Sequence, residues 1–251
     1  MTVPRIVLVD DEQPARNRLL ELLGDCAGEF PHVVVGQAAN GFEGLQLVTT
    51  GSADIALVDI HMPGMSGIEF VRHLQVLEQP PRVVFVTAHD QYAVQAFELN
   101  AVDYLLKPVR AARLLAALKK CLAGTQITRE VLERIDPNPR RHLSVAERGR
   151  VTLVPVADIL FLKAELKYVT VRTREREFLI EEPLSQLEQE FASAFVRIHR
   201  NCLVAKRLIR GVERGDGEEG EPGWAVLIEG WEEKLPVSRR QWPILKEFLK
   251  A

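Results

Sequence analysis

Four short apolar runs in the first half of the chain each end at a polar side chain. The runs are rich in β-branched residues and lack alternating polar positions, a pattern typical of strands buried on both faces of a parallel sheet. In open α/β sheets the ligand crevice lies at the carboxyl ends of the strands, so we expect these polar side chains to meet there. The runs and the residues that follow them are Ile6–Val9 with Asp10 and Asp11, Ile55–Val58 with Asp59, Val83–Val86 with Thr87, and Tyr104–Leu106 with Lys107.

Helix-like segments lie between these runs. Pro14 stands near the first turn of one segment and Gly24 follows its expected end, as is common at helix termini. Strand and helix alternate over residues 1–123, which predicts right-handed βαβ units and one doubly wound, five-stranded parallel α/β sheet. The expected helices are Pro14–Leu23, Gly41–Thr50, Ile68–Leu77, Gln91–Leu99 and Val109–Leu122, with a further strand at Val33–Val35.

The second half of the chain has a different pattern. Residues 124–141 are polar and contain two prolines, which predicts a linker. Short strand-like segments separated by turns then predict a mainly β domain over residues 142–251. Strands are expected within 150–154, 159–162, 168–172, 177–180, 203–204, 225–228 and 234–237, helices at Leu184–Phe191 and Trp242–Leu249, and a solvated loop at Glu213–Gly223.

Composition and charge narrow the class of protein. At 251 residues the chain should hold roughly two domains. No apolar run approaches the ~18 residues of a membrane span and the start lacks a signal peptide, so we expect a soluble cytoplasmic protein that does not associate with membranes. The net charge of −3 hides an asymmetry, because Lys and Arg number 10 against 14 Asp and Glu in residues 1–124 but 14 against 9 in residues 140–212. This asymmetry indicates that an acidic half, which binds metal, is joined to a basic half, which binds an anion.

The polar strand ends suit phosphoryl transfer to a carboxylate. Asp59 precedes a glycine-rich loop and can act as the nucleophile, while Asp10 and Asp11 add the oxygen ligands that Mg²⁺ takes. Lys107 supplies a positive charge for a phosphoryl oxygen and Thr87 a hydroxyl donor. Helix capping explains an Asp or Thr at any single strand end, but it does not explain all of them together.

The motifs LVDDE, VDIHMPGMSG, VTAHD and DYLLKP give residues 5–123 a resemblance to the receiver domain of response regulators. The resemblance implies that Asp59 is the phosphoacceptor, with a sensor histidine kinase as the phosphoryl donor. It also implies that Mg²⁺ is bound by Asp11, Asp59 and the backbone carbonyl of His61, while Asp10 acts mainly through water. We do not expect the His61 side chain to bind the metal, because hard Mg²⁺ prefers oxygen.

A switch within the receiver domain is implied by the same resemblance. Thr87 and Tyr104 would form the switch pair, which is compatible with Tyr104 being a half-buried strand aromatic. The bond between Lys107 and Pro108 would be cis. A homodimer formed on activation is expected to use a face within about Gln91–Leu122, since the switch pair borders it.

The segments ILFLKAELKYVTVRT, FVRIHRNCLV and LPVSRR give the second half a resemblance to the LytTR family of DNA-binding domains. That family is a compact β assembly whose loops, rather than a recognition helix, enter the major groove. The resemblance implies double-stranded promoter DNA as the partner, whereas charge alone also fits a solvated basic surface. We expect His199 and Asn201 to fix a loop first and to contact DNA second. The base-contacting candidates are Lys167, Arg200 and Arg239, with Arg240, His199, Asn201 and Arg150 as further DNA-binding candidates. Arg148, Arg150 and Arg172 are expected to hold phosphates.

Together these features predict a non-enzymatic, phosphorylation-controlled transcription regulator of a two-component system. One alternative is a phospho-dependent adaptor whose β domain binds a protein partner or an acidic ligand; a mobility-shift assay on DNA would discriminate the two. A second alternative is a Mg²⁺-dependent phosphohydrolase that uses Asp59, but the second half offers no catalytic cluster that would extend such a site.

Overall fold

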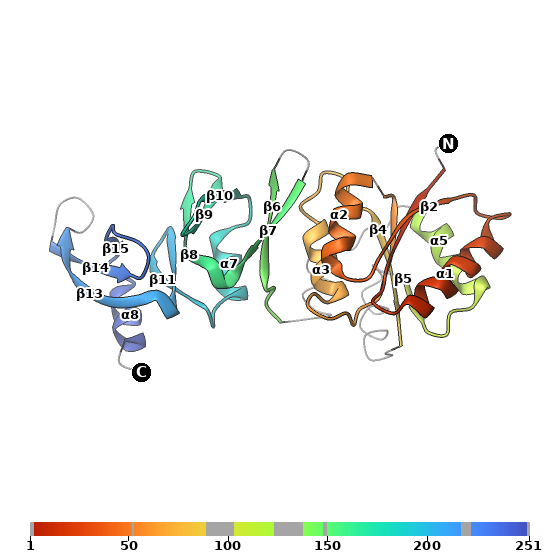
Figure 1. Cartoon of the computed structure of the whole chain (residues 1–251). Coiled ribbons are helices and arrows are strands. Elements are labelled where there is room, and N and C mark those ends of the chain that lie inside the picture. Colours follow the sequence, from red (N-terminus) through yellow and green to blue (C-terminus); the bar gives the residue numbers. More distant parts are fainter. Residues whose placement is uncertain are drawn as a thin grey trace. The chain divides into compact units, whose positions relative to one another are not determined.

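The computed structural model describes residues 3–51, 53–88, 103–122, 138–147, 150–216 and 222–249 (Figure 1). The chain forms two compact units, residues 1–138 with 146–151 and residues 139–145 with 152–251. Each unit has its own hydrophobic core. The division into residues 1–123, a linker at 124–141 and residues 142–251 stays a prediction, and most of that linker lies outside the described residues.

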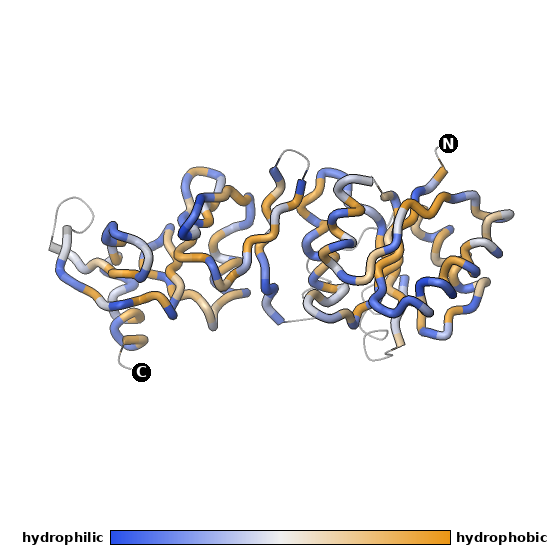
Figure 2. The backbone as a smooth tube through the Cα atoms, in the orientation of Figure 1, coloured by the Kyte–Doolittle hydropathy of each residue, from blue (hydrophilic) through white to orange (hydrophobic). Residues whose placement is uncertain are grey.

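Unit 1 is built on a parallel sheet of five strands in the order β2-β1-β3-β4-β5. Helices α2 and α3 lie on one side of the sheet and α1 and α5 on the other (Figure 1), which confirms the doubly wound arrangement. The strands are hydrophobic along their length (Figure 2), as expected for strands covered on both faces. The elements are β1 Arg5–Val9, α1 Gln13–Cys26, β2 Val33–Ala38, α2 Gly41–Gly51, β3 Ile55–Val58, α3 Gly67–Leu74, β4 Arg82–Thr87, β5 Asp103–Leu106 and α5 Ala111–Leu122.

Two helix ends in unit 1 differ from the prediction by three residues each, while α5 begins two residues later than predicted, at Ala111. Helix α1 continues through Gly24 to Cys26, because Leu23 and Cys26 are buried on its inner face. Helix α3 ends at Leu74, and turns follow it. The predicted helix Gln91–Leu99 lies outside the described residues.

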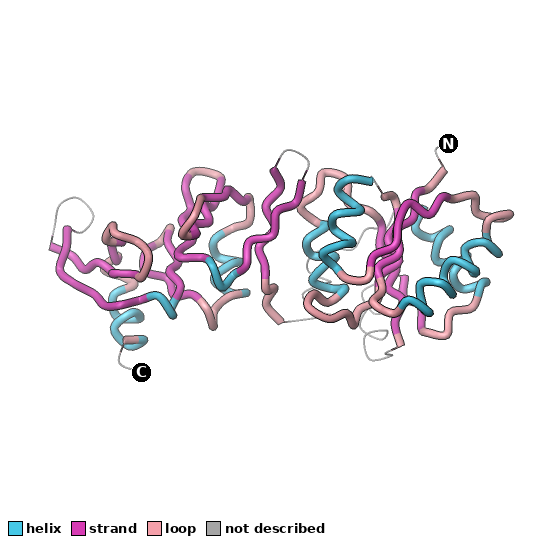
Figure 3. The backbone as a smooth tube through the Cα atoms, viewed as in Figure 1, coloured by secondary structure: helices cyan, strands magenta, loops and turns pink. Residues whose placement is uncertain are grey.

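Unit 2 is mainly β (Figure 3). One antiparallel sheet has the strand order β10-β9-β8-β12-β11, and a second has the order β13-β14-β15. Strands β6 and β7 pair as a separate two-stranded sheet. The elements are β6 His142–Glu147, β7 Arg150–Pro155, η1 Val156–Asp158, β8 Ile159–Glu165, β9 Tyr168–Thr173, β10 Glu177–Ile180, α7 Leu184–Glu190, β11 Phe195–His199, β12 Cys202–Ala205, η2 Lys206–Leu208, β13 Ile209–Asp216, β14 Pro222–Ile228, β15 Leu235–Val237 and α8 Trp242–Phe248.

The predicted solvated loop at Glu213–Gly223 is partly wrong. Strand β13 continues to Asp216 and β14 begins at Pro222, with Glu213 opposite Ala225. Arg214 on β13 is exposed and Glu213 pairs with Lys234, so the strand carries these charged side chains without burying them unpaired. Strands β6, β11 and β13 were not predicted.

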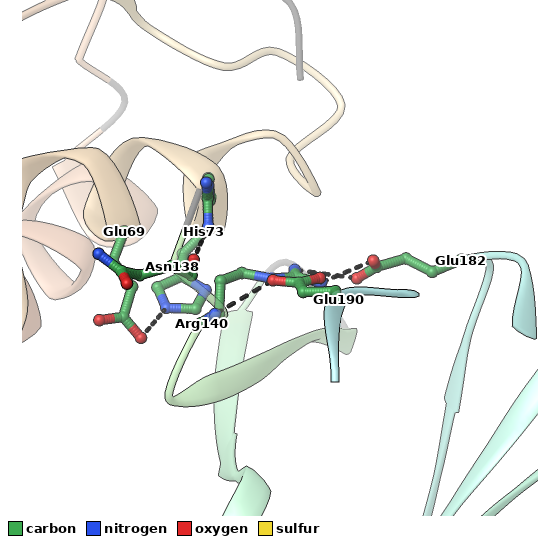
Figure 4. Close-up of polar contacts among 7 residues, drawn as sticks. Glu69, His73, Asn138, Arg140, Glu182 and Glu190 are labelled. Atoms are coloured by element: carbon green, nitrogen blue, oxygen red, sulfur yellow. Dashed lines mark hydrogen bonds and ion pairs between the residues drawn. The ribbon is translucent and has the colours of Figure 1, made fainter. Parts of the chain in front are cut away.

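A buried arginine fixes the beginning of unit 2. Arg140 is only 5% exposed, and its guanidinium lies 2.7 Å from Glu182 Oε2 and 2.8 Å from Glu190 Oε2 (Figure 4). Burial lowers the pKa of Arg140, but the hydrogen bonds and charges of the two carboxylates outweigh burial and raise it. The chain that enters unit 2 is thereby tied to both ends of the α7 region.

Within the described parts of the chain, every helix is too short or too polar to cross a bilayer.

Candidate functional site

The acidic residues of unit 1 gather where β1 and β3 end. These neighbouring strands pair in parallel, so Asp10 and Asp59 follow the paired residues Val9 and Val58. The backbone N–H of Asp59 donates to the carbonyl of Val9 at 2.8 Å. Asp10, Asp11 and Asp59 each offer a carboxylate oxygen within 4.8 Å of the others. The cluster occupies the point where the strand order of the sheet reverses, the usual ligand crevice of this architecture.

Lys107 bridges the two buried carboxylates. Its Nζ lies 2.8 Å from Asp59 Oδ2, 2.9 Å from Asp10 Oδ2 and 3.5 Å from Glu12 Oε2. Burial lowers the pKa of this ammonium, but its contacts with Asp59 and Asp10 outweigh burial and hold the pKa above its ordinary value. Burial raises the pKa of Asp10 against the opposing effect of Lys107. The ammonium is therefore charged at neutral pH.

The donor set of this cluster fits Mg²⁺. All side-chain donors are carboxylate oxygens, the ligands that a hard divalent cation prefers. Asp10 and Asp59 are buried while Asp11 is exposed, so a metal there could keep water on its open side. Three carboxylates against the single ammonium of Lys107 leave an excess of negative charge that a divalent cation would neutralise.

The predicted switch residues lie on β4 and β5, the two strands that follow β3 in the sheet. Thr87 is fully buried at the end of β4, and its carbonyl accepts a hydrogen bond from the backbone N–H of Lys107 at 2.8 Å. Tyr104 is half-buried on β5, opposite Phe85. The cis bond between Lys107 and Pro108 is confirmed. The switch roles of Thr87 and Tyr104 stay predictions.

The loop after Asp59 contains a glycine whose importance the sequence did not indicate. A Cβ atom at Gly67 would lie 2.0 Å from the carbonyl oxygen of Asp59, so only glycine lets α3 begin this close to the acidic cluster. Ser66 caps α3 by accepting a hydrogen bond from the N–H of Glu69 at 3.1 Å. The backbone N–H of His61 donates to Asp59 Oδ1 at 3.3 Å. Metal binding by the carbonyl of His61 stays a prediction.

Unit 2 brings together three turns at one of its ends, and each of these turns carries predicted DNA-binding residues. The antiparallel pairing of Lys163 with Cys202 places the β8–β9 turn beside the β11–β12 turn, and the N–H of Ala164 donates to the carbonyl of Asn201 at 2.8 Å. The N–H of Ser238 donates to the carbonyl of Ile198 at 2.9 Å, which brings the segment after β15 to this end. We call the group of three turns the turn edge. It carries Leu166 and Lys167, His199 to Asn201, and Arg239 and Arg240.

Comparison with known proteins matches the two halves of the chain separately. A model described as the response regulator receiver domain matches residues 6–119, and one described as the LytTr DNA-binding domain matches residues 149–250. The positive alginate biosynthesis regulatory protein of Pseudomonas aeruginosa is 42% identical over 213 residues, which are 83% of this chain and 85% of that protein. This chain belongs to the LytTR response regulators.

Two further relatives match this chain over most of their length. An uncharacterized response regulatory protein of Vibrio cholerae is 38% identical over 249 residues, which are 97% of each chain. The transcriptional regulatory protein LytR of Staphylococcus aureus is 31% identical over 215 residues, 84% of this chain and 86% of that protein. The joined receiver and LytTR domains make this chain a phosphorylation-controlled transcription regulator.

The β11–β12 turn of the LytTR domain is held by its own side chains. The ring Nδ1 of buried His199 contacts Oδ1 of Asn201, as expected for residues that fix a loop. Arg197, which the sequence analysis did not single out, donates from Nε to the carbonyl of His199 at 3.2 Å and from Nη2 to the carbonyl of Arg200. Its Nη1 also pairs with Glu188 on α7. Nothing in the segment FVRIHRN distinguishes this arginine from a surface charge; only the folded turn shows its contacts.

The remaining basic candidates differ in their surroundings. Arg150 is exposed at the first residue of β7, whereas Arg148 lies outside the described residues. Arg172 is engaged within the protein, because its Nη1 lies 2.6 Å from Glu177 and its guanidinium carbon 4.4 Å from the centroid of the Trp231 ring. Exposed Arg239 and Arg240 follow β15. Of the predicted phosphate contacts, the exposed Arg150 is therefore the better candidate. Arg172 would have to break its ion pair with Glu177 before it could bind a phosphate.

Proposed function

We propose that Asp59 accepts a phosphoryl group from a sensor histidine kinase and that this phosphorylation controls binding of the LytTR domain to double-stranded promoter DNA. The observation that carries the receiver half of the proposal is the contact of Lys107 with Asp59 inside a cluster of three carboxylates. A partly buried ammonium next to an acidic strand end has a direct use in holding a phosphoryl oxygen. We also propose that the protein is not an enzyme acting on a separate small substrate.

In the proposed reaction a carboxylate oxygen of Asp59 attacks the phosphorus of a phosphohistidine. A P–O bond forms, the P–N bond breaks, and the leaving histidine takes up a proton. Bound Mg²⁺ would neutralise phosphoryl oxygens, and Asp10, Asp11 and Asp59 with the carbonyl of His61 would hold it. The ammonium of Lys107 leaves its ion pair with Asp59 for a phosphoryl oxygen. The hydroxyl of Thr87 donates a hydrogen bond to another phosphoryl oxygen. The side chain of Tyr104 moves in response to this movement of Thr87.

The test of the receiver half is phosphorylation by acetyl phosphate with Mg²⁺, read by intact-protein mass. Wild-type protein should gain one phosphoryl group, and Asp59→Asn should gain none. Asp54→Asn is a matched control, since Asp54 lies at the opposite end of the same strand, where Oδ2 accepts a hydrogen bond from the N–H of Arg5 at 2.8 Å. Equal phosphorylation of Asp59→Asn at another residue would overturn the assignment.

For the DNA-binding half we propose that Arg200 and Arg239 read base edges, with Lys167 beside them, while Arg150 binds a phosphate. The support is position, because the first three lie in the turn edge and Arg150 lies on a strand. Arg200→Ala should cost roughly 1–3 kcal/mol on the cognate site and little on scrambled DNA. Arg150→Ala should weaken both alike and lower the slope of log affinity against log salt by about 0.9. Equal losses on both DNAs for Arg200→Ala would make it a phosphate contact.

We propose further that activation favours a homodimer through the receiver face around β5 and α5. Leu106 at the end of β5 and Leu122 at the end of α5 are 46% and 56% exposed, and Tyr104 lies on β5. Sedimentation of the protein with beryllium fluoride and Mg²⁺ should show a dimer that the Asp59→Asn variant does not form. A monomer that still binds its DNA site with full affinity under these conditions would contradict the proposal.

A further inference from the structure

The β8–β9 turn of the LytTR domain has an unusual residue at its tip. Glu165 pairs with Tyr168, which leaves Leu166 and Lys167 as a two-residue turn. Leu166 has a φ of 55°, and among the described residues all others with positive φ are glycines. Two-residue hairpin turns use glycine or asparagine at such positions, because a branched side chain meets steric strain there.

Leu166 also exposes its side chain completely. Its relative exposure of 108% is the highest among the exposed large hydrophobic residues in the described part of the chain. A single exposed leucine is ordinary by itself. Here the exposure and the strained backbone coincide at one residue, so the fold gains nothing from leucine at this position. Strained residues of this kind gather at ligand-binding sites, where the gain comes from the ligand.

The surroundings of Leu166 indicate the ligand. The turn edge brings it beside the β11–β12 turn with Arg200 and near the segment with Arg239. Lys167 follows it directly, and its Nζ lies 5.0 Å from the centroid of the neighbouring Tyr168 ring. Glu165, the carboxylate nearest in sequence, is paired with Lys163 at 2.7 Å. The basic groups suit the phosphates of DNA, and the apolar tip between them suits an apolar group on a base edge.

We infer that Leu166 contacts the 5-methyl group of a thymine in the major groove and is a specificity-determining residue of this regulator. An aliphatic side chain can neither donate nor accept a hydrogen bond, so it cannot read the polar base edges. The thymine methyl is the apolar group that base pairs present in the major groove. The inference rests on the proposed DNA-binding function and adds a contact to Arg200, Arg239 and Lys167.

The test replaces thymines of the cognate site one at a time with deoxyuridine, which deletes only the methyl group. At one or two positions the wild-type protein should bind about fourfold more weakly, as expected for one apolar carbon removed from a contact. The Leu166→Gly variant should be weaker on the natural site and insensitive to the same replacements. Leu179→Ala is the control, since Leu179 is exposed on β10 of the same domain, outside the turn edge.

Loss of DNA binding in Leu166→Gly should not result from loss of folding. Glycine relieves the strain of a positive φ, so Leu166→Gly should keep or raise the melting temperature. If the deoxyuridine losses were the same in wild type and Leu166→Gly, the inference would be wrong while DNA binding itself stood. If wild-type protein bound cognate and scrambled DNA equally, the proposed function would fail first.

Discussion

The guanidinium of Arg197 donates a hydrogen bond to the backbone carbonyl of Arg200, the residue that we propose reads a base. The same guanidinium holds the carbonyl of His199 and pairs with Glu188. One side chain therefore links α7 to both residues at the start of the β11–β12 turn. Arg197 has the contacts of a positioning residue, because it fixes the backbone from which the Arg200 side chain projects.

Replacing Arg197 with lysine should weaken specific DNA binding more than non-specific binding. A lysine ammonium cannot hold two carbonyls and a carboxylate in the fixed fork of a guanidinium. We expect a cost of about 1 kcal/mol on the cognate site, the typical cost of ordering a loop side chain on binding. A salt titration on cognate and scrambled DNA measures it, and the salt slope should stay unchanged. Arg210→Lys is the control, because Arg210 is exposed. Equal losses on both DNAs would assign Arg197 to phosphate binding.

Removing Lys107 should separate phosphorylation from its output. In Lys107→Met the three carboxylates remain, so Mg²⁺ binding measured by calorimetry should persist. The phosphoryl group would lose its positively charged partner, so DNA affinity should no longer rise when beryllium fluoride and Mg²⁺ are added. Lys119→Met is the control, since Lys119 makes an exposed ion pair with Glu29 at 2.9 Å. A Lys107→Met protein that responds fully to beryllium fluoride would refute this role.

Loss of Arg140 should destabilise the LytTR domain strongly. Arg140→Met would remove the cation that contacts the largely buried Glu182 and Glu190, and breaking such a buried ion pair typically costs roughly 3–5 kcal/mol. All three tryptophans lie beyond residue 220, so fluorescence during urea unfolding reports on this domain. Arg174→Met, which removes an exposed pair with Glu229, should change stability by about 1 kcal/mol or less. Similar midpoints for the two variants would contradict the expectation.

The buried cysteines should resist alkylation in the folded protein. Burial raises the pKa of Cys121 to about 11 and that of Cys202 to about 12, so the reactive thiolate is scarce at mildly alkaline pH. Labelling with iodoacetamide, read by mass, should be slow until urea is added. Because the folded pKa values are raised, this contribution to stability is present below the unfolded thiol pKa and is lost as the pH rises toward 11 and 12. Rapid native labelling of Cys202 would show that its β-strand opens readily.

The sequence predicted the parallel sheet and its acidic crevice because both follow from local patterns. Apolar strands that end in aspartate or lysine must bring those side chains together once the strands are parallel and adjacent. The contacts of Arg197 could not be predicted, since they depend on how β11, β12 and α7 pack. The extension of α1 past Gly24 shows the same limit, because the burial of Cys26 overrides a common stop signal.

The turn edge is held together by bonds between main-chain atoms, from Ala164 to Asn201 and from Ser238 to Ile198. The side chains at positions 166, 167, 200 and 239 do not take part in those two bonds. Natural selection can therefore exchange the side chains that we propose to contact DNA, while the framework that presents them stays intact. Under this proposal, a single substitution at the tip of one of these turns would change the preferred DNA sequence without changing the fold.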